Sequence, residues 1–217
     1  MPRVIHTGQA LVDATATVPA LPERGQNVMG ERWCRSAGGA VNILAAAARS
    51  GAACVHAGAI GTGPNGDLVR AALAAEGVVW SADPVEELDT ALCVVLVEPT
   101  GERTFVTLQG AERRLTVEAL SSARPRPGDL VCVTGYTLAV DSTRDPLLTW
   151  LPSLPTGAPV VLDPGAAFAG LPAQIRDEML SATSVWTSNL EEARALVGDL
   201  DMAAAASAMS GLLPDGA

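Results

Sequence analysis

The chain has 217 residues, of which 48% are hydrophobic, which is enough for one sizeable core and too few for two comfortable domains. Its formal net charge of −10 argues against a surface for nucleic acid or anionic membrane, because such surfaces gather Lys and Arg to neutralise phosphates. No apolar run approaches the roughly 20 residues of a membrane helix. We therefore expect a cytoplasmic α/β protein that acts on a small molecule, with neither nucleic acid nor membrane as a partner.

Strand and helix patterns alternate along most of the chain. Short apolar runs predict strands at 3–7, 53–60, 78–80, 130–134, 159–163 and 184–187. Helical spacing of apolar residues predicts helices at 39–50, 67–75, 145–151, 173–180 and 190–196. This alternation is typical of a parallel sheet covered by helices on both faces, whose ligands bind beyond the carboxyl ends of the strands.

Two regions break the alternation. Residues 28–34 form one strand candidate, and residues 91–97 and 103–108 form a hairpin that turns at 98–101. A small separate sheet that acts as a lid over the main site would explain them, because a lid excludes water from a reactive centre.

Cysteine and histidine give little sign of a metal site. The four cysteines are widely spaced, form no Cys-x-x-Cys pair and are expected to be reduced core residues: Cys34, Cys54, Cys93 and Cys132. His6 and His56 each lie inside an apolar run, where a packed core side chain is the expected role. A histidine-based metal site is therefore not expected.

The segment 37–42, with the sequence AGGAVN, leads straight into the helix predicted at 39–50. Glycines let the backbone approach a ligand, and a helix N-terminus offers free N–H groups. Asn42 can both donate to and accept from sugar hydroxyls. Taken alone, the segment fits a glycine-rich turn before an Ala-rich helix as well as it fits a ligand loop.

The order of several motifs resembles the ribokinase (PfkB) family of carbohydrate and nucleoside kinases. The Gly38-Gly39 pair with Asn42 resembles the first signature of that family, and Gly51 and Gly61 match its later spaced glycines. The other segments that carry the resemblance are, in chain order, Gly8 with Asp13, LPERG at 21–25, 90–105, GAE at 110–112, Asp163-Pro164 and NLEE at 189–192. The resemblance spans nearly the whole chain.

This resemblance implies a ribokinase-like three-layer αβα sandwich with a mainly parallel central sheet and a small antiparallel β lid. Residues 1–217 would form one domain, with lid segments at about 14–36 and 90–109. The implied activity is ATP-dependent phosphoryl transfer to a hydroxyl of a sugar or nucleoside. Lid sheets in this family commonly pair between subunits, which implies a homodimer.

The resemblance also assigns residues to the substrate. Its implied ligands are Asp13, Gly38, Gly39, Asn42 and Arg103. Read without the family, Arg103 is equally well a solvated charge.

The implied cofactors are ATP and Mg²⁺. Asn189 and Glu192 would organise the phosphates, and Glu192 would hold the metal through metal-bound water, since Mg²⁺ keeps much of its hydration shell. As local structure, Asn189 is expected to be the N-cap of the helix that starts at Leu190, a role compatible with binding.

One family element has no counterpart in this sequence. The catalytic base of the family is an aspartate in a Gly-Ala-Gly-Asp segment near the C-terminus, and no such segment occurs. We therefore assign no catalytic residue and expect that the C-terminal part of the kinase is missing. Asp201 and Asp215 lack the flanking glycines and are expected to be surface residues.

Two alternatives to a kinase also fit the sequence. Residues 61–66, with the sequence GTGPNG, match Gly-x-Gly-x-x-Gly, and Asp83 follows at close to the spacing of a ribose-binding acid, which would fit an NAD-dependent oxidoreductase. The second alternative is a non-catalytic module that binds a sugar or nucleoside.

Overall fold

The computed structural model describes residues 1–214 and 216. Its main body is built on a six-stranded sheet with the strand order β10-β9-β8-β1-β4-β5. The strands are β1 (Arg3–His6), β4 (Ala53–His56), β5 (Val79–Trp80), β8 (Leu130–Thr134), β9 (Val160–Asp163) and β10 (Val185–Trp186). Every neighbouring pair in this order runs parallel.

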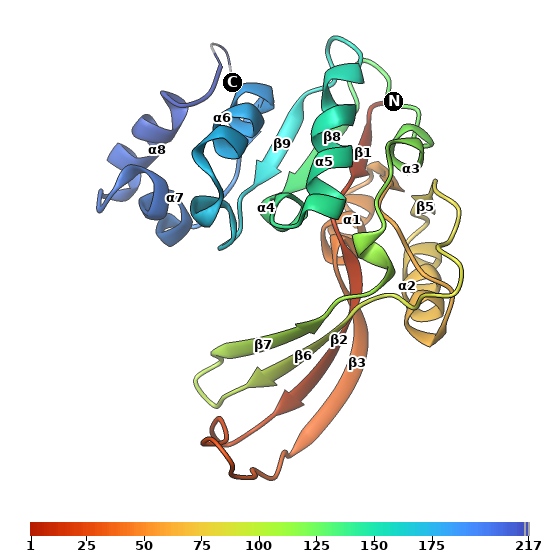
Figure 1. The fold of residues 1–217 in the computed structure, drawn as a ribbon, viewed down its shortest axis with the longest axis vertical. Coiled ribbons are helices and arrows are strands. Elements are labelled where there is room, and N and C mark those ends of the chain that lie inside the picture. Colours follow the sequence, from red (N-terminus) through yellow and green to blue (C-terminus); the bar gives the residue numbers. More distant parts are fainter. Residues whose placement is uncertain (215, 217) are drawn as a thin grey trace.

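Helices cover both faces of this sheet (Figure 1). They are α1 (Ala40–Arg49), α2 (Pro64–Ala75), α3 (Val117–Ser121), α4 (Gly135–Leu138), α5 (Asp141–Trp150), α6 (Ala173–Ala182), α7 (Leu190–Val197) and α8 (Met202–Ser210). Alternate residues of one strand point to opposite faces, so Ile5 joins one apolar cluster and Val4 packs against the other. The expected three-layer, mainly parallel α/β fold is confirmed.

A four-stranded sheet projects from the main body (Figure 1). Its order is β3-β2-β6-β7, with β2 (Ala10–Thr17), β3 (Arg32–Gly39), β6 (Leu92–Val97) and β7 (Arg103–Leu108). The expected small separate sheet is present, but it is mixed and not antiparallel throughout, because β2 and β6 pair in parallel. Each is the first strand of a hairpin that leaves the main body, so the two run in the same direction where they meet.

The first hairpin also differs from the expected strand at 28–34. The observed strand β3 pairs with β2 from Ala10–Gly39 to Thr17–Arg32, and β2 itself was not predicted. The pairing with β2 continues through Gly38 and Gly39 to the end of β3. Gly39, with φ of +60°, then makes the turn into α1.

Most of the expected core positions are confirmed. His6 and His56 are 1% and 0% exposed, and Cys54 and Cys93 are buried. All four cysteines are free, but Cys34 is exposed, so its assignment to the core is wrong. It lies on β3, an edge strand of the projecting sheet.

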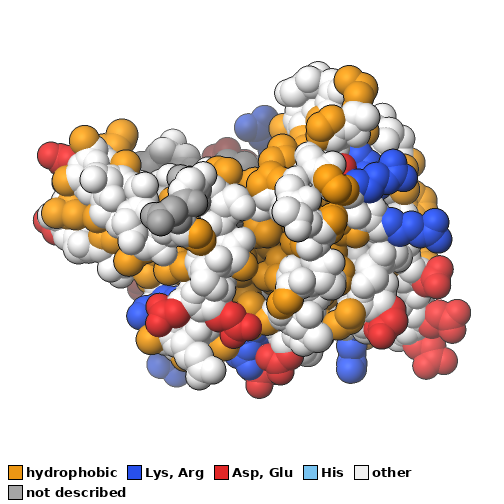
Figure 2. All heavy atoms as spheres, turned by 90° about the horizontal axis from the view of Figure 1, so that it is seen from above, with side chains coloured by type: hydrophobic (Ala, Val, Ile, Leu, Met, Phe, Trp, Pro, Cys, Tyr) orange, Lys and Arg blue, Asp and Glu red, His pale blue; other side chains and the backbone are white. Residues whose placement is uncertain are grey.

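The described part of the chain contains no helix that is both long and apolar enough to cross a membrane. Figure 2 shows the end of the molecule away from the projecting sheet, where hydrophobic and uncharged groups fill the middle of the face and acidic and basic side chains lie mainly at its margin.

Candidate functional site

The strand order reverses between β1 and β8. From β1 the chain proceeds to β4 and β5 on one side, and from β8 it proceeds to β9 and β10 on the other. The crevice at the carboxyl ends of strands on either side of such a reversal is where open α/β sheets bind ligands. The residues that follow β1 and β8 therefore define the candidate site.

Asp13 lies near this point, on β2, opposite Ser36 of β3. Its carboxylate lies directly over Gly38, where an added Cβ would be 2.0 Å from Oδ2 of Asp13. Only glycine leaves room for the carboxylate in this position. Burial raises the pKa of Asp13 above its usual value, and the positive charge of Arg103 opposes that rise.

Gly39 joins the end of β3 to α1 and packs against Gln9, in the connection between β1 and β2. A Cβ at Gly39 would lie 2.4 Å from the Gln9 carbonyl oxygen, which accepts a hydrogen bond of 2.9 Å from the Ala40 N–H. Asn42 lies in the first turn of α1 and is exposed. The structure thus brings Asp13 and Gly38 into contact and places Asn42 in the adjoining helix.

Arg103 lies on β7, on the same face of the projecting sheet as Asp13. The cross-strand pairs Arg103–Val97 and Val97–Thr17 put Arg103 on the face of Thr17, and Thr17 and Asp13 are four residues apart on one strand. The guanidinium carbon lies 5.8 Å from the centre of the Phe105 ring. Arg103 therefore belongs to the face that carries Asp13.

Asn189 and Glu192 lie at the other flank of the sheet, after β10, and form a capping box at the start of α7. The Glu192 N–H donates to Oδ1 of Asn189 at 2.8 Å, and the Asn189 N–H donates to Oε2 of Glu192 at 3.1 Å. The expected N-cap role of Asn189 is confirmed. Oε1 of Glu192 takes no part in these two bonds.

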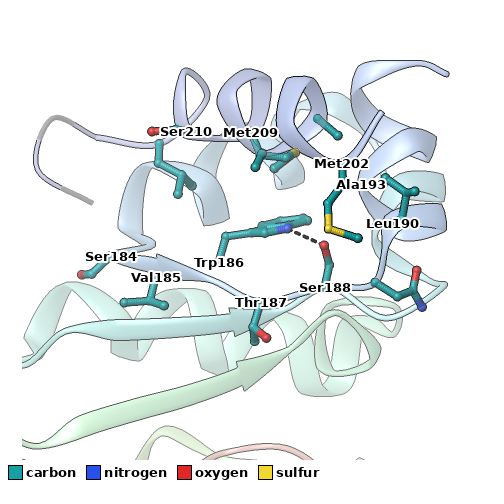
Figure 3. A pocket seen from close by; sticks show the side chains of 14 residues that line it. Ser184, Val185, Trp186, Thr187, Ser188, Leu190, Ala193, Met202, Met209 and Ser210 are labelled. Carbon is teal, nitrogen blue, oxygen red and sulfur yellow. Dashed lines mark hydrogen bonds between the residues drawn. The ribbon is translucent and has the colours of Figure 1, made fainter. Parts of the chain in front are cut away.

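A groove of about 750 Å³ adjoins Asn189 (Figure 3). The indole Nε1 of Trp186 donates to Oγ of Ser188 at 2.7 Å. The apolar part of the lining comes from Val185, Trp186, Leu190, Ala193, Met202, Ala205, Ala206, Met209 and Leu213. An apolar groove beside polar groups is a common form of ligand site.

The two groups of candidate residues share an edge of the sheet but do not touch. Asp13 follows β1, Asn189 follows β10, and three strand spacings of about 4.8 Å put those strands about 14 Å apart. The carboxyl end of the sheet can therefore accommodate an extended ligand between Asp13 and Asn189.

A metal held directly by the protein would need several ligands in one place. Within the described residues, no three His, Cys, Asp or Glu side chains come close enough to form such a site. Mg²⁺ often uses one or two carboxylates and keeps its waters, so the carboxylate of Glu192 fits water-mediated binding of Mg²⁺.

The loop at 61–66 is closed to a pyrophosphate by a residue that sequence reasoning missed. The carboxylate of Asp89 accepts hydrogen bonds from the N–H groups of Asn65 and Gly66, at 3.1 and 2.9 Å. It thereby places a negative charge at the start of α2, where a dinucleotide would need N–H donors. A Cβ at Gly66 would lie 2.0 Å from the Gly61 carbonyl oxygen, so close packing explains these glycines and the structure does not support the oxidoreductase hypothesis.

Glu112, part of the GAE segment at 110–112, has a structural role that the sequence did not indicate. Its buried carboxylate accepts hydrogen bonds from the N–H groups of Ala91 and Gly110, at 3.1 and 3.0 Å, and so ties together both ends of the β6–β7 hairpin. Asp201 is the N-cap of α8, accepting from the Ala204 N–H at 2.8 Å, and Asp215 lies outside the described residues.

The chain is similar to known carbohydrate kinases. The family model for pfkB family carbohydrate kinases matches residues 1–217. A curated relative from Escherichia coli K12, the uncharacterized sugar kinase YegV, is 31% identical over 191 residues, which make up 88% of this chain and 59% of the relative. The chain thus spans less than two thirds of that relative.

Solved structures share the fold. The adenosine kinase from Sinorhizobium meliloti superposes with a TM-score of 0.83 at 18% identity, over 98% of this chain and 72% of that one. The Arabidopsis thaliana ribokinase complexed with ribose and ATP gives a TM-score of 0.74 at 21% identity, over 98% of this chain and 69% of that one.

Proposed function

This chain belongs to the pfkB family of carbohydrate kinases. From that premise we propose that it is the substrate-binding part of a kinase. The proposed kinase transfers the γ-phosphoryl group of ATP to a hydroxyl of a sugar or nucleoside. The observation that carries the proposal is the carboxylate of Asp13, which lies over Gly38 beside the reversal in strand order. Phosphoryl transfer needs positioning and charge stabilisation more than covalent catalysis, so such a pocket is a large part of what the reaction needs.

The substrate residues have distinct roles in this proposal. Asp13 accepts hydrogen bonds from substrate hydroxyls, and Asn42 both donates and accepts. Gly38 and Gly39 let the ligand and the carboxylate approach the backbone. Arg103 extends the site from the projecting sheet and interacts electrostatically with Asp13.

The nucleotide would bind at the other flank of the same edge. Asn189 and Glu192, already fixed by their capping box, would orient the phosphates of ATP. When bound, Mg²⁺ supplies charge neutralisation at the phosphoryl group, with Glu192 holding it through a metal-bound water. No described residue is assigned as the catalytic base.

The projecting sheet is proposed as the lid of a single domain over residues 1–217. Its Asp13 face would cover the substrate and exclude water, with the expected lid segments at about 14–36 and 90–109. On the opposite face, Trp33, Val106 and Leu108 expose 56% to 70% of their surface. That face is proposed to pair in a homodimer, and the protein is proposed to act in the cytoplasm.

Calorimetric titration of the chain with D-ribose, D-fructose and adenosine, followed by Mg-ATP, and separately with NAD, tests the proposal. We expect at least one of the three compounds to bind, and Asp13→Asn to weaken that binding at least tenfold. Asp83→Asn is the matched control, since Asp83 is an exposed carboxylate distant in sequence from both groups. Binding of a sugar without ATP would favour the non-catalytic module, whereas tight binding of NAD or no binding of any of the three would refute the kinase proposal.

A further inference from the structure

Tyr136 is the one tyrosine of the chain, and it lies at the reversal in strand order. It belongs to α4, which starts directly after β8, and 50% of its surface is exposed. A half-exposed aromatic side chain at the carboxyl end of this strand is at the edge where the ligand is proposed to bind.

The position of the Tyr136 ring is fixed on one side. Gly165, with φ of +52°, lies beneath it, and a Cβ there would be 2.6 Å from Cε2 of Tyr136. Gly135 packs as closely against the residue that follows β9, since a Cβ there would be 1.9 Å from the Pro164 carbonyl oxygen. Two glycines thus let the ring and its helix approach the end of β9.

The backbone around the ring is tied to the substrate residues. The Arg113 Nη1 donates to the Tyr136 carbonyl oxygen at 3.3 Å. The neighbouring Thr137 accepts at Oγ1 from Nε2 of Gln9 at 3.4 Å, and the Gln9 carbonyl oxygen accepts from the first N–H of α1. The backbone that carries the ring is therefore part of a wall that continues through Gln9 to Gly39.

The chemistry of this wall complements that of Asp13. A sugar ring has polar hydroxyls at its rim and an apolar face of C–H groups. A carboxylate binds the hydroxyls, and an aromatic ring with a free face packs against the C–H face.

We propose that Tyr136 is a specificity-determining residue whose exposed ring face packs against the C–H face of a cyclic sugar while Asp13 binds its hydroxyls. The inference rests on the proposed function and makes it narrower. Packing against Tyr136 favours a furanose or pyranose ring over an open-chain polyol, because the polyol has no flat apolar face.

The test is calorimetric titration of the 217-residue chain with D-ribose, D-fructose and adenosine, and with ribitol as the open-chain probe. We compare Tyr136→Leu, Tyr136→Phe and, as a control on a partly exposed aromatic residue of the opposite edge strand β5, Trp80→Leu. Tyr136→Leu should weaken the best-binding cyclic compound about tenfold, whereas Tyr136→Phe should stay within about threefold and Trp80→Leu should match the parent. Ribitol should bind more weakly than the cyclic compound to the parent, and that preference should shrink in Tyr136→Leu.

Gly165→Ala provides a second route, because it displaces the ring without removing it and should weaken binding in the same direction. Equal binding by the parent and Tyr136→Leu would overturn the inference and leave the proposed function standing. An equal loss in Tyr136→Phe would assign the effect to the hydroxyl and overturn ring packing. Failure of all three cyclic compounds to bind the parent would remove the proposed function and this inference together.

Discussion

The two histidines predict a steep loss of stability in mild acid. His6 and His56 are paired across β1 and β4 and are almost fully buried. Nδ1 of His6 accepts from the Gly8 N–H at 3.0 Å, whereas Nε2 of His6 and both ring nitrogens of His56 have no partner among the described residues. Burial lowers the pKa of His6 to about 4, and burial, reinforced by the charge of His6, lowers the pKa of His56 to about 3.

The sign follows from which state binds protons. In the unfolded chain both imidazoles have a pKa near 6.5. Below pH 6.5 the unfolded state therefore binds protons that the folded state does not bind. Stability is therefore complete above pH 6.5 and falls as the pH drops towards the folded values. At pH 5 each histidine costs about 2 kcal/mol and the pair about 4 kcal/mol, a large share of a typical free energy of unfolding of about 5–15 kcal/mol.

Urea unfolding followed by tryptophan fluorescence between pH 8 and pH 5 measures this loss. His56→Leu should roughly halve the dependence on pH, because the chain has only two histidines. Cys54→Ala, on the same strand and also buried, is the control: it should lower stability at every pH and leave the slope unchanged. A free energy of unfolding that stays constant from pH 8 to pH 5, or a slope unchanged in His56→Leu, would refute the reasoning.

Three further predictions concern other positions. Gly38→Ala should weaken sugar binding at least tenfold in calorimetry by displacing the Asp13 carboxylate, and undiminished binding would separate that carboxylate from the substrate. Asp89→Ala should lower the free energy of unfolding by about 2 kcal/mol in urea, because it removes the acceptor at the start of α2; a change below about 0.5 kcal/mol would contradict this. Asp129→Ala should cost about 3 kcal/mol in the same assay by leaving Arg3 without its buried partner, and a loss under about 1 kcal/mol would show that the ion pair matters little.

The main sheet could be predicted because its signals are local. Each of its strands is a short apolar run, and α1 shows helical spacing that ends at Gly51. The capping box was equally readable, since Asn189 and Glu192 are three residues apart and their bonds join neighbours in sequence. Such interactions depend on little beyond the segment itself.

The projecting sheet was harder to read for the opposite reason. The sequence of β2, ALVDATAT, offers small and polar side chains in place of an apolar run, and its pairing with β3 and β6 decides its structure. Asp89 lies 23 residues from Gly66, in the first turn of the helix that it caps. Neither relation shows in local sequence.

The order of the strands has the largest consequence for the site and is the feature that the sequence hides most fully. Short apolar runs in chain order do not say that β8 returns to lie beside β1. Because it does, Gln9 and Thr137, 128 residues apart, meet at one crevice. Asp13 lies on β2, which begins directly after Gln9, and Tyr136 lies beside Thr137 in α4. The rule that ligands bind at the carboxyl ends of parallel strands identifies the correct end of the sheet. The reversal between β1 and β8 then identifies where along that end the ligand binds.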